Sequence, residues 1–363
     1  MKKMNIAAFI MALAMSVTAT SCAKSNTNDN SSDTSKETTT ESATETTVAD
    51  PTEATTEDAS EDATANPYGT TADIESYIKT TDINPPLWKV TDPESGNTIY
   101  LLGTMHVLPE KASDYSEQLM DIYKNCDSIA VEYDTVALMD DASAMLEFQQ
   151  GFLYTDGTTI KDHISEETYK QLTDYFESMG GYSAMYDQFN TGFFINQLNS
   201  VMLLRLENLK TEGTDTYFMN LAKDDNKEVI SIETLDTQIK ALSAYSDDYA
   251  EYTLKESLDS MNDIDEYAEE IGELYELWAN GSGEILFDME EDIDDLPEDL
   301  TDDYEDYKKL MLDDRNKGMA DKAEELLKEG KNCLFMVGAL HYSEDVGVDN
   351  LLEAKGYTVE KIA

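Results

Sequence analysis

The sequence is poor in three residue types that often carry chemistry: histidine, cysteine and arginine. Its 363 residues include three histidines and three cysteines, and arginine occurs only at Arg205 and Arg315. Positive charge is scarce as well, because 25 lysines and arginines face 77 acidic residues and leave a formal net charge of -52. This deficit argues against nucleic acid as a partner and against electrostatic adhesion to anionic lipid.

The N-terminus lacks a hydrophobic run long enough to span a membrane. The apolar stretch Ile6–Ala14 follows two lysines and is too short for an ordinary transmembrane helix, so Met1–Ser21 is typical of an export signal. The motif Ala19–Cys22 resembles a bacterial lipobox, in which Cys22 becomes the lipidated first residue and the acyl chains anchor the protein. The alternative is a plain secretory signal cut near Cys22.

The segment that follows has almost nothing to bury. Residues 23–67 are nearly all Ser, Thr, Asp, Glu, Asn and Ala, a composition that cannot offset the entropy lost on ordering. We therefore predict a disordered tether over residues 22–77. Residues 78–363 are then one domain, or a core with an inserted lobe.

Two cysteines remain if Cys22 carries the lipid. Cys126 and Cys333 flank or lie in predicted strands, which predicts two buried thiols. A disulfide between them is the alternative in an oxidising exterior, and the sequence leaves both open.

Two of the three histidines occupy matching positions. His106 ends Gly103–His106 and His341 ends Gly338–His341, and each Gly-x-x-His motif closes an apolar, strand-like run. Glycine before each histidine lets the backbone turn sharply at the end of the strand, where a Cβ atom would be crowded. In open α/β sheets, ligands bind outside the carboxyl ends of strands, so the repeated motif predicts one shared site.

The elements around the first motif alternate. Apolar residues 87–90 and 98–103 flank turn-forming residues and predict a β-hairpin. Residues 113–125 have helical spacing, and Ser128–Glu132 follows as a buried strand. Strand, helix and strand form a βαβ unit, so we expect parallel pairing. Glu132 would then lie on the same rim as the first motif's histidine.

The middle of the chain is predicted to be mainly helical. Helical patterns cover residues 137–222 and 237–278, and the strand pattern Glu228–Glu233 separates them. The acidic segment Asp288–Asp306 lacks the glycine and spacing of an EF-hand and predicts a solvated loop or helix edge. A helix over Tyr307–Leu327 precedes the second motif. The expected fold is α/β, leaning toward α+β: a mixed sheet flanked by helices, with a largely helical central insertion.

His106, Glu132 and His341 form a candidate set of metal ligands. Two imidazoles and a carboxylate suit zinc, manganese, cobalt or iron(II). Three protein ligands leave positions open for water and substrate. The alternative is that each histidine only hydrogen-bonds a neighbouring carbonyl group.

Arg315 and Glu233 are candidates for supporting roles. A guanidinium beside a metal can bind a substrate carboxylate or stabilise an oxyanion, whereas the alternative is a helix-surface ion pair with an adjacent aspartate. Glu233 ends a predicted strand and is a candidate general base or ligand support, unless it caps the following helix. His163 precedes a predicted helix and is expected to be an ordinary surface or capping residue.

Short motifs follow one another between Pro86 and Ile362 in a definite order. They are Leu87–Val90, Leu101–His106, Ala130–Glu132, Ile232–Thr234 with Gln238, Arg315–Asn316 with Met319–Ala320, Val337–His341, Leu351–Leu352 and Gly356–Val359. In this order they resemble the TraB/GumN family, which includes the pheromone-shutdown proteins and is similar to the Tiki metalloproteases.

The resemblance implies a fold related to the erythromycin esterase and ChaN-like folds. It also implies a site of His106, His341 and Glu132, with Arg315 and Glu233 in support. Because Tiki proteins resemble manganese- or cobalt-dependent peptidases, the implied reaction is peptide hydrolysis.

Together these observations favour a lipid-anchored, extracytoplasmic, metal-dependent hydrolase that acts on peptides. Glu132 would be a ligand or proton acceptor, and Arg315 would steady the developing oxyanion or a peptide terminus. One alternative is a protein that sequesters a pheromone-like peptide without cleaving it. Another is a surface carrier of metal or haem. Ligands with open positions favour the hydrolase, because binding alone does not require them.

Overall fold

The structure is a computed structural model that describes residues 66, 68–210, 212–282, 296–342 and 346–363. The predicted export signal, the lipidation site Cys22, most of the predicted tether and the first part of the acidic segment Asp288–Asp306 lie outside these residues. Within the described ranges, no helix is both long and apolar enough to cross a membrane.

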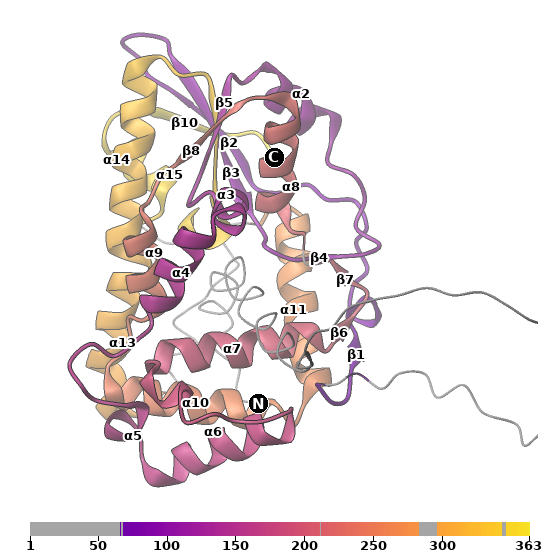
Figure 1. The fold of residues 1–363 in the computed structure, drawn as a ribbon. Helices are drawn as coiled ribbons and strands as arrows, with labels where there is room; N and C mark the ends of the chain where they lie inside the picture. The colour runs from indigo at the N-terminus through magenta and orange to yellow at the C-terminus, as the bar shows by residue number, and fades with distance from the viewer. Residues whose placement is uncertain (1–65, 67, 211, 283–295, 343–345) are drawn as a thin grey trace, which may run out of the picture.

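A six-stranded mixed sheet lies in the upper part of the molecule (Figure 1). In spatial order its strands are β10 (Thr358–Lys361), β2 (Leu87–Thr91), β3 (Thr98–Thr104), β9 (Cys333–Gly338), β5 (Ser128–Val131) and β8 (Glu228–Ser231). The predicted hairpin of β2 and β3 is antiparallel, and β10 adds to it in antiparallel fashion. The remaining neighbours pair in parallel, which confirms the predicted α/β class with a mixed sheet.

The predicted pairing of β3 with β5 is wrong, because β9 lies between them. Gly103 of β3 is opposite Val337 of β9, while Val131 of β5 is opposite Met336. Nothing local in the βαβ unit indicates a strand that arrives from far along the chain. Because β9 lies between β3 and β5, the three strands that precede the candidate site residues are adjacent in the sheet.

Helices cover both faces of the sheet (Figure 1). They are α2 (Glu117–Asn125) and α8 (Thr214–Asp225) on one face, and α14 (Asp314–Glu329) and α15 (Val348–Ala354) on the other. Successive side chains of a strand point to opposite faces. Phe335 of β9 therefore packs with Met319 and Leu352, and Met336 packs with Phe218.

The other helices gather at the carboxyl end of the parallel strands (Figure 1). They are α3 (Thr135–Asp140), α4 (Ala142–Gln150), α5 (Ile160–His163), α6 (Glu166–Ser178), α7 (Thr191–Leu204), α9 (Leu235–Leu242), α10 (Asp247–Ser260), α11 (Ile264–Ala279) and α13 (Thr301–Lys308). Apolar residues of α7, among them Phe194 and Leu198, form one cluster with Met105 and Ala339. Since the last two belong to the Gly-x-x-His motifs, the helical layer packs directly against the predicted site.

The helix before the second motif differs from its predicted form. It begins at Thr301 instead of Tyr307, so much of the described acidic segment belongs to a helix, one of the two alternatives that the sequence left open. It then continues through a π-helical turn, Lys309–Asp313, into α14. α14 ends at Gly330, whose φ of 71° is the left-handed conformation that glycine adopts without strain.

Residues that precede Ile78, the predicted start of the domain, contact the folded region. β1 (Ala72–Asp73) pairs with β6 (Leu206–Glu207). Arg205, the residue before β6, donates from Nε to the carbonyl oxygen of Thr70 at 2.8 Å. A second small pair joins β4 (Leu108–Pro109) to β7 (Leu209–Lys210). These contacts tie the segment before Ile78 to the folded region.

Cys126 and Cys333 are both buried free thiols. Burial raises the pKa of Cys126 to about 12 and that of Cys333 to about 11, so both stay protonated at neutral pH. Of the two interpretations that the sequence left open, the structure therefore shows the pair of buried thiols.

Candidate functional site

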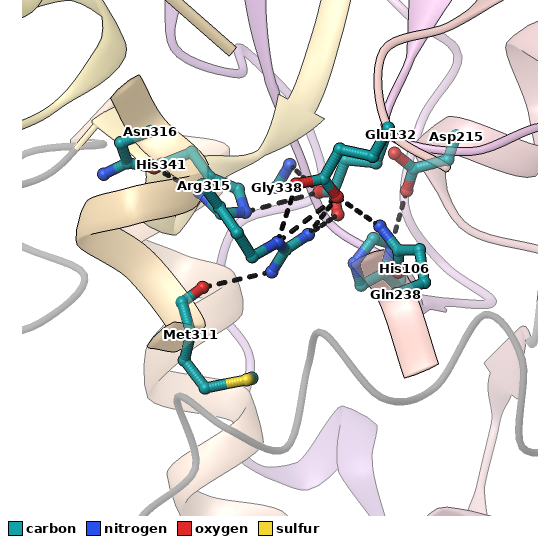
Figure 2. Close-up of polar contacts among 10 residues, drawn as sticks. His106, Glu132, Asp215, Gln238, Met311, Arg315, Asn316, Gly338 and His341 are labelled. Carbon is teal, nitrogen blue, oxygen red and sulfur yellow. Dashed lines mark hydrogen bonds and ion pairs between the residues drawn. The ribbon is translucent and has the colours of Figure 1, made fainter. Parts of the chain in front are cut away.

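Three neighbouring strands bring His106, His341 and Glu132 together at their carboxyl ends (Figure 2). His106 follows β3 by two residues, Glu132 directly follows β5, and His341 lies in the turn Ala339–Tyr342 after β9. Nε2 of His341 is 3.7 Å from Oε1 of Glu132. The prediction that the two motifs meet in one sheet is therefore confirmed.

Gly338 lies between these three side chains. A Cβ atom at this position would lie 3.3 Å from Oε1 of Glu132 and 3.8 Å from Nε2 of His106. The N–H group of Gly338 donates to the same Glu132 oxygen at 2.8 Å. Neither Gly103 nor Gly338 has a positive φ, so a left-handed conformation does not explain them. A Cβ atom at either position would be crowded, as the sequence predicted, because its nearest neighbour would lie 3.3 Å away.

Each histidine of the site has one ring nitrogen fixed and the other free. Nδ1 of His106 lies 2.6 Å from Oδ2 of Asp215, and Nδ1 of His341 lies 2.5 Å from Oδ1 of Asn316. Because both partners are acceptors, Nδ1 carries the proton and, in the neutral ring, Nε2 carries a lone pair. Both Nε2 atoms are buried without a hydrogen-bond partner among the described residues. A buried polar atom left unpaired costs about 1–3 kcal/mol, so these two ring nitrogens are candidate ligand atoms.

Arg315 joins Glu132 to Glu233, and its contact with Glu132 can be followed in Figure 2. Its Nη2 donates to Glu132 at 2.7 Å and to Glu233 at 2.8 Å, and its Nε donates to Glu233 at 2.9 Å. Nη1 donates to the carbonyl oxygen of Met311, which lies in the π-helical turn, a feature frequent at functional sites. Gln238 donates to Glu233 from the other side at 2.5 Å.

These contacts remove two of the alternatives. Arg315 is buried, so it is not a helix-surface residue paired with an adjacent aspartate. Glu233 does not cap the following helix, because Thr234 is the N-cap residue and accepts from the N–H group of Thr237.

The sequence matches the TraB/PrgY/gumN family over residues 86–361. The chain belongs to the TraB/PrgY/gumN family. No curated protein and no solved structure matches it. The matched region extends from just before β2 to the end of β10, and it contains every site residue described above.

The histidines of this TraB/PrgY/gumN family member have different pKa values. Burial lowers the pKa of His106, but the carboxylate of Asp215 outweighs this effect and raises it above its usual value. Burial lowers the pKa of His341 to about 3, so this ring is neutral at neutral pH. Burial also opposes ionisation of Glu132, but neighbouring charges hold its pKa below the usual range. Because His341 is neutral at neutral pH, the permanent positive charge beside Glu132 is that of Arg315.

The described site buries more carboxyl groups than guanidinium groups. Those of Glu132 and Glu233 pair with Arg315, and that of Asp215 pairs with the His106 ring. An unbalanced buried charge is costly in a medium of low dielectric constant. A divalent cation between the imidazoles would balance it.

The donor types at the site, imidazole nitrogen and carboxylate oxygen, suit a divalent cation. Two ligand atoms about 2.1 Å from a tetrahedral ion lie about 3.4 Å apart, and the nearest nitrogen–oxygen pair here is 3.7 Å apart. Oε1 of Glu132 keeps a lone pair beyond its bond from Gly338. Within the described ranges, no group of three or more His, Cys, Asp or Glu side chains is placed to hold a metal ion as it stands. The fit therefore rests on the two unpartnered ring nitrogens.

All five residues that the sequence suggested for the site lie together in it. They are His106, Glu132, Glu233, Arg315 and His341. Asp215, in contrast, gives no signal in the sequence, because an acidic residue in the first turn of a helix is common for reasons of helix stability alone. Asn316 belongs to the Arg-Asn motif, but its spacing does not indicate a contact with His341.

The third histidine has other partners. His163 stacks on Tyr154 with ring centroids 4.1 Å apart. Its ring nitrogens lie 2.8 Å from Asp247 and 2.8 Å from Thr158. These contacts connect the short helix α5 to the start of α10, and none of them involves the site.

Proposed function

We propose that this protein is a metal-dependent hydrolase that cleaves peptides, anchored outside the cytoplasm of a bacterium by a lipid at Cys22. One observation carries the catalytic part of the proposal. Two buried imidazole nitrogens without partners converge beside an ionised glutamate, and the opposite nitrogen of each ring is fixed by a side-chain oxygen. This is the usual arrangement of histidines that bind a metal.

His106, His341 and Glu132 would hold the divalent ion, which we expect to be manganese, cobalt or zinc. Such an ion, when bound, lowers the pKa of water and polarises the carbonyl group of a substrate. Glu132 enters the reaction as a carboxylate, because its pKa is held below the usual range. It can therefore ligate the ion through Oε1 or accept a proton from water.

Arg315 acts on Glu132 in this proposal. Its guanidinium orients the carboxylate of Glu132. The guanidinium is itself fixed by Glu233, which also accepts from Gln238. We therefore give Arg315 and Glu233 positioning roles, instead of the oxyanion and general-base roles considered from the sequence.

The choice of peptides as substrates rests on the resemblance to the Tiki metalloproteases. The location rests on the N-terminal sequence, where an export signal precedes a lipobox-like motif that ends in Cys22. Radiolabelled palmitate incorporated by the wild type and absent from Cys22→Ala would test the anchor. Equal labelling of the two proteins would refute it.

Metal content tests the catalytic proposal first. The full chain is loaded with manganese, cobalt or zinc, dialysed and measured by elemental mass spectrometry. We expect about one ion per chain in the wild type, and little in His106→Ala or His341→Ala. His163→Ala is the matched control, because it removes a histidine outside the site and should bind metal normally.

Cleavage of a peptide library, followed by mass spectrometry, is the second step. Activity should appear in the wild type and in His163→Ala, and should be lost in His106→Ala. A folded wild-type protein that binds no metal would refute the proposal. Peptides that are bound but recovered intact would instead support a protein that sequesters its ligand.

A further inference from the structure

The start of helix α8 packs directly against His106 and the residue before it. The N–H group of Thr214 donates to the carbonyl oxygen of Met105 at 2.8 Å. A Cβ atom on Gly213 would lie 2.2 Å from the backbone carbon and oxygen of His106, so only glycine fits there. The next residue but one, Asp215, then meets the imidazole at 2.6 Å. This backbone packing therefore places the carboxylate of Asp215 beside the ring of His106.

The two histidines of the site differ in this support. His341 is held by the amide of Asn316, which is neutral, whereas His106 is held by a carboxylate. Asp215 is buried, and among the described residues its side chain hydrogen-bonds only to His106. No lysine or arginine neutralises it there. A buried carboxylate is retained at a cost in stability, so a role at the imidazole explains its presence better than folding does.

We propose that Asp215 is the positioning residue of His106: it keeps the proton on Nδ1 and directs Nε2 as a lone-pair donor toward Glu132. The hydrogen bond on one ring nitrogen decides which nitrogen carries the proton. In metal sites, loss of such a partner typically lowers metal affinity about 10–100-fold. The inference rests on the proposed function, since it concerns the same site.

The first experiment needs no metal. Long-range proton–nitrogen NMR spectra of the full, metal-free chain report which nitrogen of each histidine is protonated. They are recorded at about pH 9, above the ordinary pKa of an imidazole. Three histidines make assignment simple with His163→Ala and His341→Ala. We expect Nδ1–H at His106 in the wild type and in D215N, because an amide oxygen also accepts. In D215A the proton should move to Nε2.

The second experiment measures the dissociation constant for manganese by titration. D215A should bind about 10–100-fold more weakly than the wild type. D215N should recover most of this loss. Asp224→Ala, which removes an exposed acid from the other end of the same helix, is the control and should leave both readouts unchanged.

Several outcomes would overturn the inference. They are a His106 ring in D215A that keeps its proton on Nδ1, an unchanged affinity in D215A, or an equal loss in D215A and D215N. If D215A does not fold, Asp215→Leu keeps the number and branching of the side-chain heavy atoms without an acceptor and gives the same test. If the wild type binds no metal, the proposed function fails, but the NMR comparison still decides the role of Asp215.

Discussion

Replacement of Arg315 by methionine removes the cation that two buried carboxylates share. The guanidinium lies 2.7 Å from Glu132 and 2.8 Å from Glu233, and the three side chains are only 4%, 12% and 6% exposed. Loss of one partner from a buried ion pair costs about 3–5 kcal/mol, because it leaves a charge without compensation. We expect R315M to lower the free energy of unfolding by about this amount.

The assay is urea unfolding of the full chain, followed by circular dichroism. The control is Lys240→Met, whose partner Asp236 lies at 2.6 Å but whose side chains are 74% and 72% exposed. Such surface pairs contribute less than about 1 kcal/mol. The double variant R315M/E233Q should recover part of the loss, because it removes one of the stranded charges. If R315M and K240M lost the same free energy, the reasoning about burial would be refuted.

Two further predictions concern the site and the stability at low pH. Gly338→Ala places a Cβ 3.3 Å from Oε1 of Glu132. We therefore expect a folded protein whose affinity for manganese, measured by titration, is reduced about tenfold or more. An affinity equal to that of the wild type would contradict this. Burial raises the pKa of Glu251, but Lys255, Ser165 and other donors lower it from the usual 4.5 to about 2. Its stabilising effect, about 1–3 kcal/mol, is then present at pH 7 and lost as the pH falls from 4.5 to 2. The difference in unfolding free energy between wild type and Glu251→Gln should shrink over that window, and a pH-independent difference would contradict it.

The strand-end residues could be predicted because their signals are local. An apolar run that closes in Gly-x-x-His places His106 and His341 without knowledge of any partner. The position of β9 between β3 and β5 could not be predicted this way, since Glu132 and Gly338 are 206 residues apart in sequence. Strand order depends on long-range pairing, which local periodicity does not report.

The supports of the site were harder to predict than its centre. Asp215 and Asn316 each fix a ring nitrogen, but they come from helices on opposite faces of the sheet, with no fixed spacing to the histidines. Crowding at Gly338 was predicted, but its cause, the carboxylate of Glu132, was not, because Glu132 belongs to a strand far away in sequence. Such facts depend on how elements meet in space.

The central place of β9 determines when the site can exist during synthesis. At about 5–20 residues per second, the 206 residues from Glu132 to Gly338 take about 10–40 s to appear. Until β9 is made, β3 and β5 have no common neighbour, and His106 and Glu132 belong to two unconnected halves of a sheet. A chain interrupted before Cys333 therefore lacks both His341 and the strand that brings His106 and Glu132 together. The proposed site can form only after β9 and the turn that follows it have been made and the sheet is joined.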